Sequence, residues 1–209
     1  MGEDEEYQEV IQETFTFSYA DKFDIEDIEE NRHLYLNGKV DSDAIGQIVY
    51  HILRYNRIDK GIPVQDRKPI VLYINTPGGN VVDGYSIVDA ILSSKTPVYT
   101  VNLGECSSMG SIIFIVGHKR FAMQHSEFLI HEGSVCCIDN TSKAKELIDF
   151  EAGDISDMTR ELILSKTKIS RWMYAKKYKT EWYFLPKEAK KLGVVDYIIG
   201  TDCDLEEII

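Results

Sequence analysis

The sequence has 209 residues, a length that fits one folded domain around a single core. Hydrophobic residues make up 44% and charged residues 28%, and no apolar run reaches the ~18 residues that a membrane-spanning helix needs. The net charge of −12 is concentrated in residues 1–30, which hold twelve acids and one lysine. This acidic arm excludes nucleic acid as an expected partner, and is either a solvated tail or a surface that a basic partner binds.

The first residues of the chain and its cysteines indicate the cellular compartment and the kinds of site to expect. Residues 1–6 are acidic where a secretory or transit peptide is basic, so we expect a cytoplasmic protein. None of the four cysteines forms a Cys-x-x-Cys pair, so we expect reduced thiols and no metal bound by these cysteines. We expect no cofactor either. The sequence lacks a Gly-x-x-x-x-Gly-Lys-Ser/Thr loop, so we do not expect this chain to use ATP by that route.

Strands and helices are predicted to alternate along the chain. The first elements are a strand at 33–38, a helix through 45–53 capped by Asp41 or Ser42, a strand at 69–75 that is buried on both faces, and a helix from 81 to 92. Next come a strand at 96–103, a turn at 104–107, a helix at 108–116, and strands at 120–123 and 127–131. The last are one long or two abutting helices at 142–168 with a single apolar stripe, helices at 172–178 and 186–191, and a strand at 194–199. This alternation indicates an α/β domain with a largely parallel sheet.

Two predicted turns between a strand and a helix are candidates for chemistry. At 75–79 (Asn-Thr-Pro-Gly-Gly), paired glycines leave backbone N–H groups free to bind a developing oxyanion, and a plain turn is the alternative. At 104–110, Ser107 and Ser108 precede an apolar helix whose N-terminus stabilises negative charge. The alternative there is that Ser107 only caps the helix.

A histidine and a carboxylate could complete a site with one of these serines. His131 ends an apolar strand beside Gly133, so its imidazole can reach a neighbouring turn as a general base; a structural histidine is the alternative. A third group should orient the imidazole, and Glu181, next to the apolar run 182–185, is the candidate. A surface acid beside a core anchor is the alternative for this residue.

The order and spacing of these motifs resemble the proteolytic subunit of the Clp protease family (ClpP) from about residue 23 to 199. The resemblance is carried by Phe23-Asp-Ile25, Leu34-Tyr-Leu-Asn-Gly38, Leu72-Tyr-Ile-Asn-Thr-Pro-Gly-Gly79, Ser107-Ser-Met-Gly110, Ile130-His131 and the stretch 187–196. It implies an α/β fold of the ClpP/crotonase type, a spiral of ββα units with a protruding handle helix at about 142–168. It also implies an acidic arm (1–30), a peptidase domain (31–200) and a C-terminal tail (201–209).

The same resemblance implies roles for individual residues. Ser108 matches the nucleophile, His131 the base and Glu181 the third member of the triad, while the backbone N–H groups of Gly79 and Met109 match the oxyanion hole. The resemblance also implies four residues beside the substrate: Gly78, Glu132, Gly133 and Ser134. The stretch 132–139 would in addition line a junction between two rings.

The resemblance further implies a serine endopeptidase that acts on unfolded polypeptides inside a closed chamber. The chamber would be a heptameric ring, which can stack into a tetradecamer, and an AAA+ unfoldase such as ClpX or ClpA would supply the work for folded substrates. Glu181 stands where the family has an aspartate, and Thr180 where it commonly has an arginine that helps ring pairing. The chain also lacks the proline that the family commonly has soon after the residue that follows the histidine, and its N-terminal arm is far more acidic.

Two other functions fit the sequence less well. An acyl-CoA enzyme of the crotonase superfamily shares the expected spiral fold, but needs no serine–histidine pair. A non-catalytic ring subunit, or a phage-type protein acting on one structural substrate, is the other alternative. A catalytically dead relative would usually lose Ser108 or His131, and this chain keeps both.

Overall fold

The computed structural model describes residues 27–134 and 140–208. The rest of the acidic arm, the Phe23-Asp-Ile25 motif and part of the 132–139 stretch lie outside the described residues. The described residues belong to two compact units, one ending at His33 and the other beginning at Leu34. In the first, residues Asp27–Asn31 form a π-helical turn, and the Asp27 carboxylate lies 2.9 Å from Nδ1 of His33.

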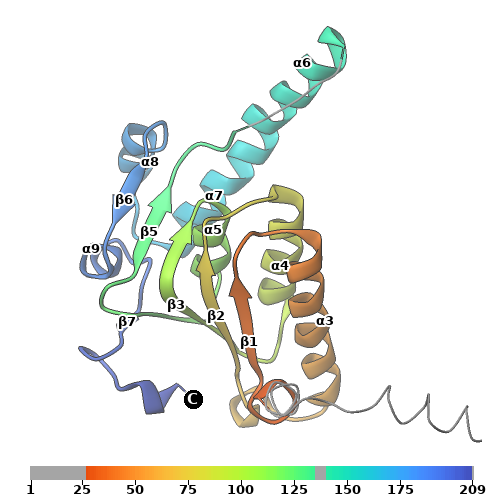
Figure 1. The fold of residues 1–209 in the computed structure, drawn as a ribbon, viewed down its shortest axis with the longest axis vertical. Coiled ribbons are helices and arrows are strands. Elements are labelled where there is room, and N and C mark those ends of the chain that lie inside the picture. Colours follow the sequence, from red (N-terminus) through yellow and green to blue (C-terminus); the bar gives the residue numbers. More distant parts are fainter. Residues whose placement is uncertain (1–26, 135–139, 209) are drawn as a thin grey trace, which may run out of the picture. The chain divides into compact units, whose positions relative to one another are not determined.

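The second unit is the expected mixture of strands and helices (Figure 1). The strands are β1 (His33–Asn37), β2 (Ile70–Thr76), β3 (Val98–Ser107), β4 (Lys119–Ala122), β5 (Glu127–Ile130), β6 (Trp182–Phe184) and β7 (Tyr197–Ile198). The helices are α3 (Ser42–Ile58), α4 (Val81–Ser93), α5 (Met109–Ile115), α6 (Thr141–Phe150), α7 (Ser156–Lys166), α8 (Arg171–Lys177) and α9 (Pro186–Lys191). No helix in the described part of the chain is long and apolar enough to cross a membrane.

The sheet has the order β1-β2-β3-β4-β7, with β5 paired to β3 and β6 paired to β5. Strands β2, β3, β4, β5 and β7 are joined by parallel pairings, and β6 runs antiparallel to β5. The largely parallel sheet expected from the sequence is therefore confirmed. Strand β2 is also as predicted: every residue in it is buried except Asn75, as a sheet covered on both faces requires.

Strand β3 changes partner halfway along its length. Its residues 99–102 pair with β4, and its residues 105–107 pair with β5. The buried Asn102 side chain connects the two halves: its Nδ2 donates to the Glu127 carbonyl (2.9 Å) and its Oδ1 accepts from the Gly104 N–H (3.0 Å). The turn predicted at 104–107 is therefore wrong, because these side-chain hydrogen bonds let the strand continue through Gly104.

The predicted helix at 142–168 is present as one helical stretch with an interruption. Helices α6 and α7 are joined by a π-helical segment, Glu151–Ile155. Figure 1 shows α6 projecting away from the sheet beyond α7. No residue of α6 is buried, whereas α7 buries Ile163 completely.

The remaining elements differ in small ways from the prediction. Helices α8 and α9 match the expected ranges within one residue, and β7 is shorter than the expected strand at 194–199. Strand β6 was not predicted, because three residues are too few to show an alternating pattern. In the C-terminal tail, Ile208 is buried against the sheet in a cluster that includes Tyr73 and Phe121.

The cap of α3 gives a first prediction. The Asp41 carboxylate accepts a hydrogen bond from the Ala44 N–H (3.0 Å), as the sequence indicated. Asp41→Ala removes the acceptor, so we expect the free energy of unfolding to fall by about 1 kcal/mol in urea titrations. The control Asp41→Ser keeps a capping oxygen and should unfold close to wild type; equal losses in both variants would contradict this role of the cap.

Candidate active site

Three neighbouring strands end at the candidate site. Strands β3 and β5 are parallel, and Ser107 pairs with Leu129, so Ser108 and His131 follow the same end of adjacent strands. Strand β6 is antiparallel to β5 and pairs its first residue, Trp182, with Ile130. Glu181, which directly precedes β6, therefore lies beside the end of β5. The sheet thus brings together residues that are 23 and 50 positions apart in the sequence.

Ser108 occupies a strained backbone conformation between β3 and α5. Its φ of 54° and ψ of −122° lie in a region that residues with a Cβ rarely adopt, at a cost of about 1–3 kcal/mol. Its N–H donates to the Leu129 carbonyl (2.9 Å), which holds the turn against β5. The Ser108 side chain makes no capping hydrogen bond, and Ser107 belongs to β3. The alternative that Ser107 only caps the helix is therefore wrong.

Helix α5 is fixed to the same two strands. The buried Ser111 hydroxyl donates to the carbonyls of Cys106 (2.6 Å) and Leu129 (3.0 Å), which lie on β3 and β5. Every residue of α5 is buried. The first turn of α5, which follows Ser108 directly, therefore has little freedom to shift relative to the strands.

His131 and Glu181 form a contact across the β5–β6 pair. Nδ1 of His131 lies 3.0 Å from Oε1 of Glu181, and 25% of the histidine side chain and 58% of the glutamate side chain are exposed. With Nδ1 engaged, Nε2 is the ring nitrogen left for proton transfer. Among the described contacts no hydrogen bond joins His131 to Ser108, and such bonds often form only when a substrate is bound.

The glycine turn after β2 lies directly against the serine turn. Gly78 has φ of +93°, and a Cβ at this position would meet the Ser108 Cβ at 2.8 Å and the Met109 nitrogen at 3.1 Å. Gly79 has φ of +155°, and a Cβ there would meet the Val40 nitrogen at 2.9 Å. Val40 holds the turn from the other side, since its N–H donates to the Gly78 carbonyl (2.9 Å) and its carbonyl accepts from the Asn80 N–H (2.8 Å).

Two backbone donors of these turns have no acceptor in the described structure. The N–H groups of Gly79 and Met109 donate to no carbonyl or side chain among the described residues. Met109 begins α5, where the first N–H groups of a helix are unpaired by geometry. Both groups are therefore available to an oxygen of a ligand.

A cavity of about 340 Å³ opens beside Ser108 and His131. Glu132, Gly133 and Ser134, which the resemblance placed beside a substrate, line it, and their contact with a substrate stays a prediction; Gly78 and Gly79 are not among its lining residues. The remaining wall was not predicted and consists mainly of apolar residues of α5 and the α6–α7 stretch, with hydroxyl groups at Ser156, Thr159 and Tyr178.

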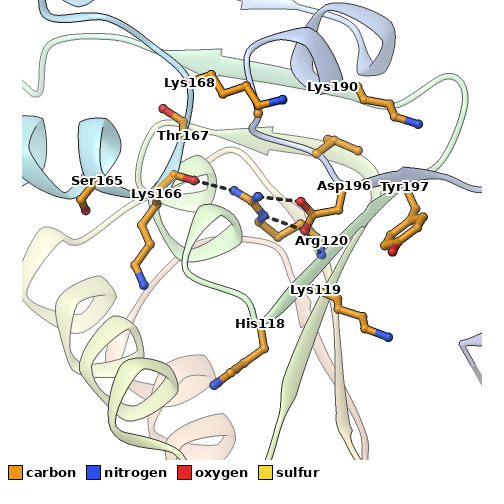
Figure 2. A pocket seen from close by; sticks show the side chains of 12 residues that line it. His118, Lys119, Arg120, Ser165, Lys166, Thr167, Lys168, Lys190, Asp196 and Tyr197 are labelled. Carbon is orange, nitrogen blue, oxygen red and sulfur yellow. Dashed lines mark hydrogen bonds and ion pairs between the residues drawn. The ribbon is translucent and has the colours of Figure 1, made fainter.

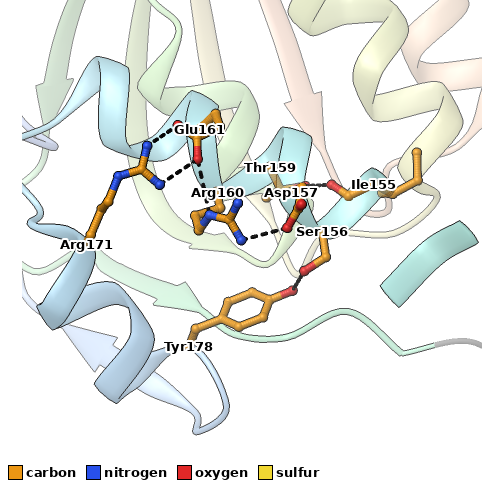
Figure 3. A network of polar contacts seen from close by, with 8 residues as sticks. All are labelled: Ile155, Ser156, Asp157, Thr159, Arg160, Glu161, Arg171 and Tyr178. Carbon is orange, nitrogen blue, oxygen red and sulfur yellow. Dashed lines mark hydrogen bonds and ion pairs between the residues drawn. The ribbon is translucent and has the colours of Figure 1, made fainter. Parts of the chain in front are cut away.

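Polar contacts fix this wall in place (Figure 3). The Tyr178 hydroxyl lies 2.9 Å from the Ser156 hydroxyl, and Arg171 donates to both oxygens of Glu161 (2.8 and 2.7 Å), so α7 is tied to α8. The Arg171 guanidinium, with a smaller contribution from Arg160, lowers the pKa of the Glu161 carboxyl. Sequence patterns could not reveal this wall, because its residues come from elements that lie far apart in the sequence.

The thiol of Cys106 is poorly suited to act as a nucleophile at this site. Cys106 is fully buried two residues before Ser108, and burial raises the pKa of its thiol well above the ordinary value, so the reactive thiolate is scarce. In the described part of the chain, no group of three or more His, Cys, Asp or Glu residues could hold a metal ion.

Comparisons with known proteins identify relatives of this chain. The Clp protease family model matches residues 20–202. The chain is 31% identical to the ATP-dependent Clp protease proteolytic subunit of Deinococcus radiodurans, over 81% of each chain. It is 32% identical to proteolytic subunit 3 of Synechococcus sp., over 81% of this chain and 82% of the relative, and 28% identical to proteolytic subunit 2 of Treponema pallidum, over 84% and 86%.

The matched segment contains the three strand ends, both turns and the cavity wall described above. A match of this extent, together with relatives above 30% identity that cover four fifths of the chain, identifies the family. This chain belongs to the Clp protease family.

Proposed function

We propose that this chain is a serine endopeptidase subunit with Ser108 as nucleophile, His131 as general base and Glu181 as the residue that orients the imidazole. The observation that carries the proposal is the convergence of three strand ends, which puts the Glu181–His131 contact (3.0 Å) and the strained Ser108 at one cavity. The order nucleophile–base–carboxylate in space is what acyl transfer by a serine requires.

The first chemical step is attack by Ser108 on the substrate carbonyl. His131 Nε2 takes the Ser108 proton as Oγ bonds to the carbonyl carbon, and the Glu181 carboxylate stabilises the imidazolium that forms. The imidazolium then gives its proton to the leaving amine, and an acyl-enzyme remains. The step requires Ser108 Oγ and His131 Nε2 to approach within hydrogen-bond distance, which we expect on substrate binding.

The unpaired N–H groups of Gly79 and Met109 suit the oxyanion of the tetrahedral intermediate. The close approach of Gly78 to the serine turn supports this role, because it places the two turns that carry these donors next to each other. Loss of one such donor in a serine hydrolase typically costs about 3 kcal/mol of transition-state stabilisation. Water, activated by His131, then attacks the acyl-enzyme and releases the second product.

We propose that an extended, unfolded polypeptide lies beside Glu132, Gly133 and Ser134, with one of its side chains in the cavity. The walls of the cavity include Ile112, Ile155 and Ile163, so an apolar substrate side chain would be desolvated there. The cavity volume of about 340 Å³ is large enough for such a side chain.

We propose that several copies assemble into a ring whose interior is the reaction chamber. The family supports an oligomeric ring protease that works with Clp ATPases, and a heptamer, which can pair with a second ring, is the form proposed here. Helix α6 supports an assembly: it buries none of its residues, and Leu147, Ile148 and Phe150 are 39%, 49% and 49% exposed. An apolar helix face of this kind favours contact with another chain. Thr180 stands where the family commonly has an arginine that helps two rings to pair. In this chain, pairing of rings would therefore depend on the apolar face of α6.

For folded substrates the proposed subunit needs a separate AAA+ unfoldase, such as ClpX or ClpA, because its own sequence has no Walker-type loop. The names of the relatives describe ATP-dependent proteases, which supports such a partner. A crotonase-type acyl-CoA enzyme and a non-catalytic ring subunit have no specific observation in their favour, since the family match is to proteases and both Ser108 and His131 are present.

The nucleophile can be tested directly. Ser108→Ala removes the covalent route, so we expect turnover of a fluorogenic peptide to fall by at least about 10⁴-fold and labelling by a fluorophosphonate probe to disappear. The native mass of the assembly should not change, because the hydroxyl makes no described structural hydrogen bond. Equal rates in both proteins would refute the mechanism.

The orienting role of Glu181 predicts a difference between two conservative variants. Glu181→Gln keeps the size of the side chain but loses its charge, so we expect kcat to fall about 100-fold with little change in KM. Glu181→Asp keeps the charge and should retain activity within about tenfold of wild type. A Gln variant as active as wild type would remove Glu181 from the triad.

The contact between the two turns can be separated from backbone strain. Gly78→Ala places a Cβ against Ser108, whereas Gly38→Ala, at φ of +108°, places one in open space. Both variants should unfold about 1–2 kcal/mol more easily, since each forces an alanine to positive φ. Only Gly78→Ala should lower kcat/KM, by about 100-fold, because it displaces the reacting groups. Equal activity of the two variants would show that the contact does not control the site.

A further inference from the structure

A second and larger cavity lies away from Ser108, at the edge of the sheet formed by β4 and β7. It measures about 620 Å³ and lies between the start of β4, the end of α7 and the segment around α9 (Figure 2). Its cationic lining residues are Lys119, Arg120, Lys166, Lys168 and Lys190, and its single acid is Asp196. With His118 counted as neutral, the lining carries +4 in a chain whose net charge is −12.

Part of this positive charge is already used within the fold. Arg120 donates to both oxygens of Asp196 (3.0 and 2.7 Å) and to the Lys166 carbonyl (2.9 Å), as Figure 2 shows. The Lys190 ammonium lies 2.6 Å from the Asp202 carboxylate, and this contact, with the Ile198 N–H, lowers the pKa of that carboxyl. Lys119 lies over the Tyr99 ring, 5.0 Å from its centroid.

Two ammonium groups of the cavity are left without an anion. Lys166 and Lys168 have exposed side chains that make no ion pair or hydrogen bond in the described structure. They flank Thr167 on one side of the cavity, while Lys119 lies on its other side (Figure 2). Like charges held around one hollow repel each other, so an anion that binds there gains from every one of them.

The chemistry of the lining favours a carboxylate-rich peptide. Phosphate is usually held by arginine side chains or by helix N-termini, whose geometry is fixed. The arginine of this cavity, Arg120, is already bound to Asp196, and no helix N-terminus is among the lining residues. Flexible lysine side chains around an open hollow instead suit several carboxylates spread along an extended chain. The sequence itself contains such a segment: residues 1–26 hold nine acids and one lysine.

Electrostatic repulsion between assembled copies favours binding of this acidic segment to a basic surface of a neighbouring copy. Each copy carries −12, so copies brought together repel one another unless opposite charges meet across their contacts. Twenty-six residues can extend over as much as about 85 Å, enough to reach a neighbouring copy.

We propose that the cavity lined by Lys119, Lys166 and Lys168 binds the acidic N-terminal segment, residues 1–26, of a neighbouring copy of this chain. The inference rests on the assembly of several copies under the proposed function, and not on the peptidase chemistry. The bound segment offsets charge repulsion between copies and links each subunit to the next, which makes the link sensitive to salt.

Zero-length cross-linking of the full chain tests the contact. Equal amounts of ¹⁴N- and ¹⁵N-labelled protein are mixed under conditions that allow reassembly and treated with a carbodiimide, which joins carboxylates to amines; mass spectrometry then identifies the linked peptides. We expect mixed-isotope links from acids of residues 1–26 to Lys166 and Lys168, at least about fivefold more abundant than links to the exposed Lys60 and Lys95. These links should be lost in ~0.5 M salt, about three times physiological ionic strength.

A matched pair of variants tests the same site without cross-linking. Binding of a fluorescent peptide of residues 1–26 to the full chain is measured by anisotropy. Lys166→Glu/Lys168→Glu should weaken it about tenfold, whereas Lys60→Glu/Lys95→Glu, with the same change of charge elsewhere, should weaken it less than about twofold. Urea unfolding and native mass confirm that each variant is folded and assembled.

The outcomes separate this inference from the proposed function. Three results in a protein that is assembled and active overturn the cavity proposal alone. They are cross-links that are equally abundant at all lysines, equal loss of peptide affinity in the two double variants, and cross-links that form only between peptides of the same isotope. A monomeric protein without mixed-isotope links overturns both the assembly and the cavity proposal. Peptidase activity lost in Ser108→Ala, with the links kept, supports both proposals independently.

Discussion

The site depends on the parallel pairing of the second half of β3 with β5. This pairing places Ser108 and His131 at one edge of the sheet, and the Ser108 N–H and the Ser111 hydroxyl both bond to Leu129 on β5. The antiparallel pairing of β6 with β5 then brings Glu181 to His131. Because β3 must leave β4 to reach β5, the hydrogen bonds of Asn102 at the branch are part of the same construction.

Much of this arrangement follows from sequence patterns, and the part that does not has a physical reason. The apolar run of β2, the cap at Asp41 and the apolar helix after Ser108 are local signals, and the structure contains all three. The continuation of β3 through residues 104–107 depends on a side chain that bonds to residue 127, and single-sequence patterns do not record such partners. The wall of the cavity, built from α5, the α6–α7 stretch and Tyr178, could not be predicted for the same reason.

The glycine turn shows that a sequence pattern can predict a backbone conformation without predicting which chain segments lie against it. Its two glycines predict freedom of the backbone, and both have positive φ. The structure adds a reason specific to each: at Gly78 a Cβ would meet Ser108, and at Gly79 one would meet Val40. Each glycine is therefore needed because another chain segment packs closely against it, as well as for the turn. Which segment that is cannot be known before the fold is known.

The π-helical segment Glu151–Ile155 changes how the long helical stretch faces its surroundings. A π-turn inserts one residue relative to an α-helix, which rotates everything beyond it by about 100° around the axis. The apolar residues expected in one stripe along 142–168 are buried to different degrees: Ile163 of α7 packs into the core, while Leu147 and Ile148 of α6 stay partly exposed, although Ile148 and Ile163 line the same cavity. The helical stretch therefore has a buried end in α7 and an exposed end in α6. Because residues 151, 152 and 155 also line the cavity beside Ser108, a partner that bends the exposed end of α6 would also change the shape of the cavity proposed to hold a substrate side chain.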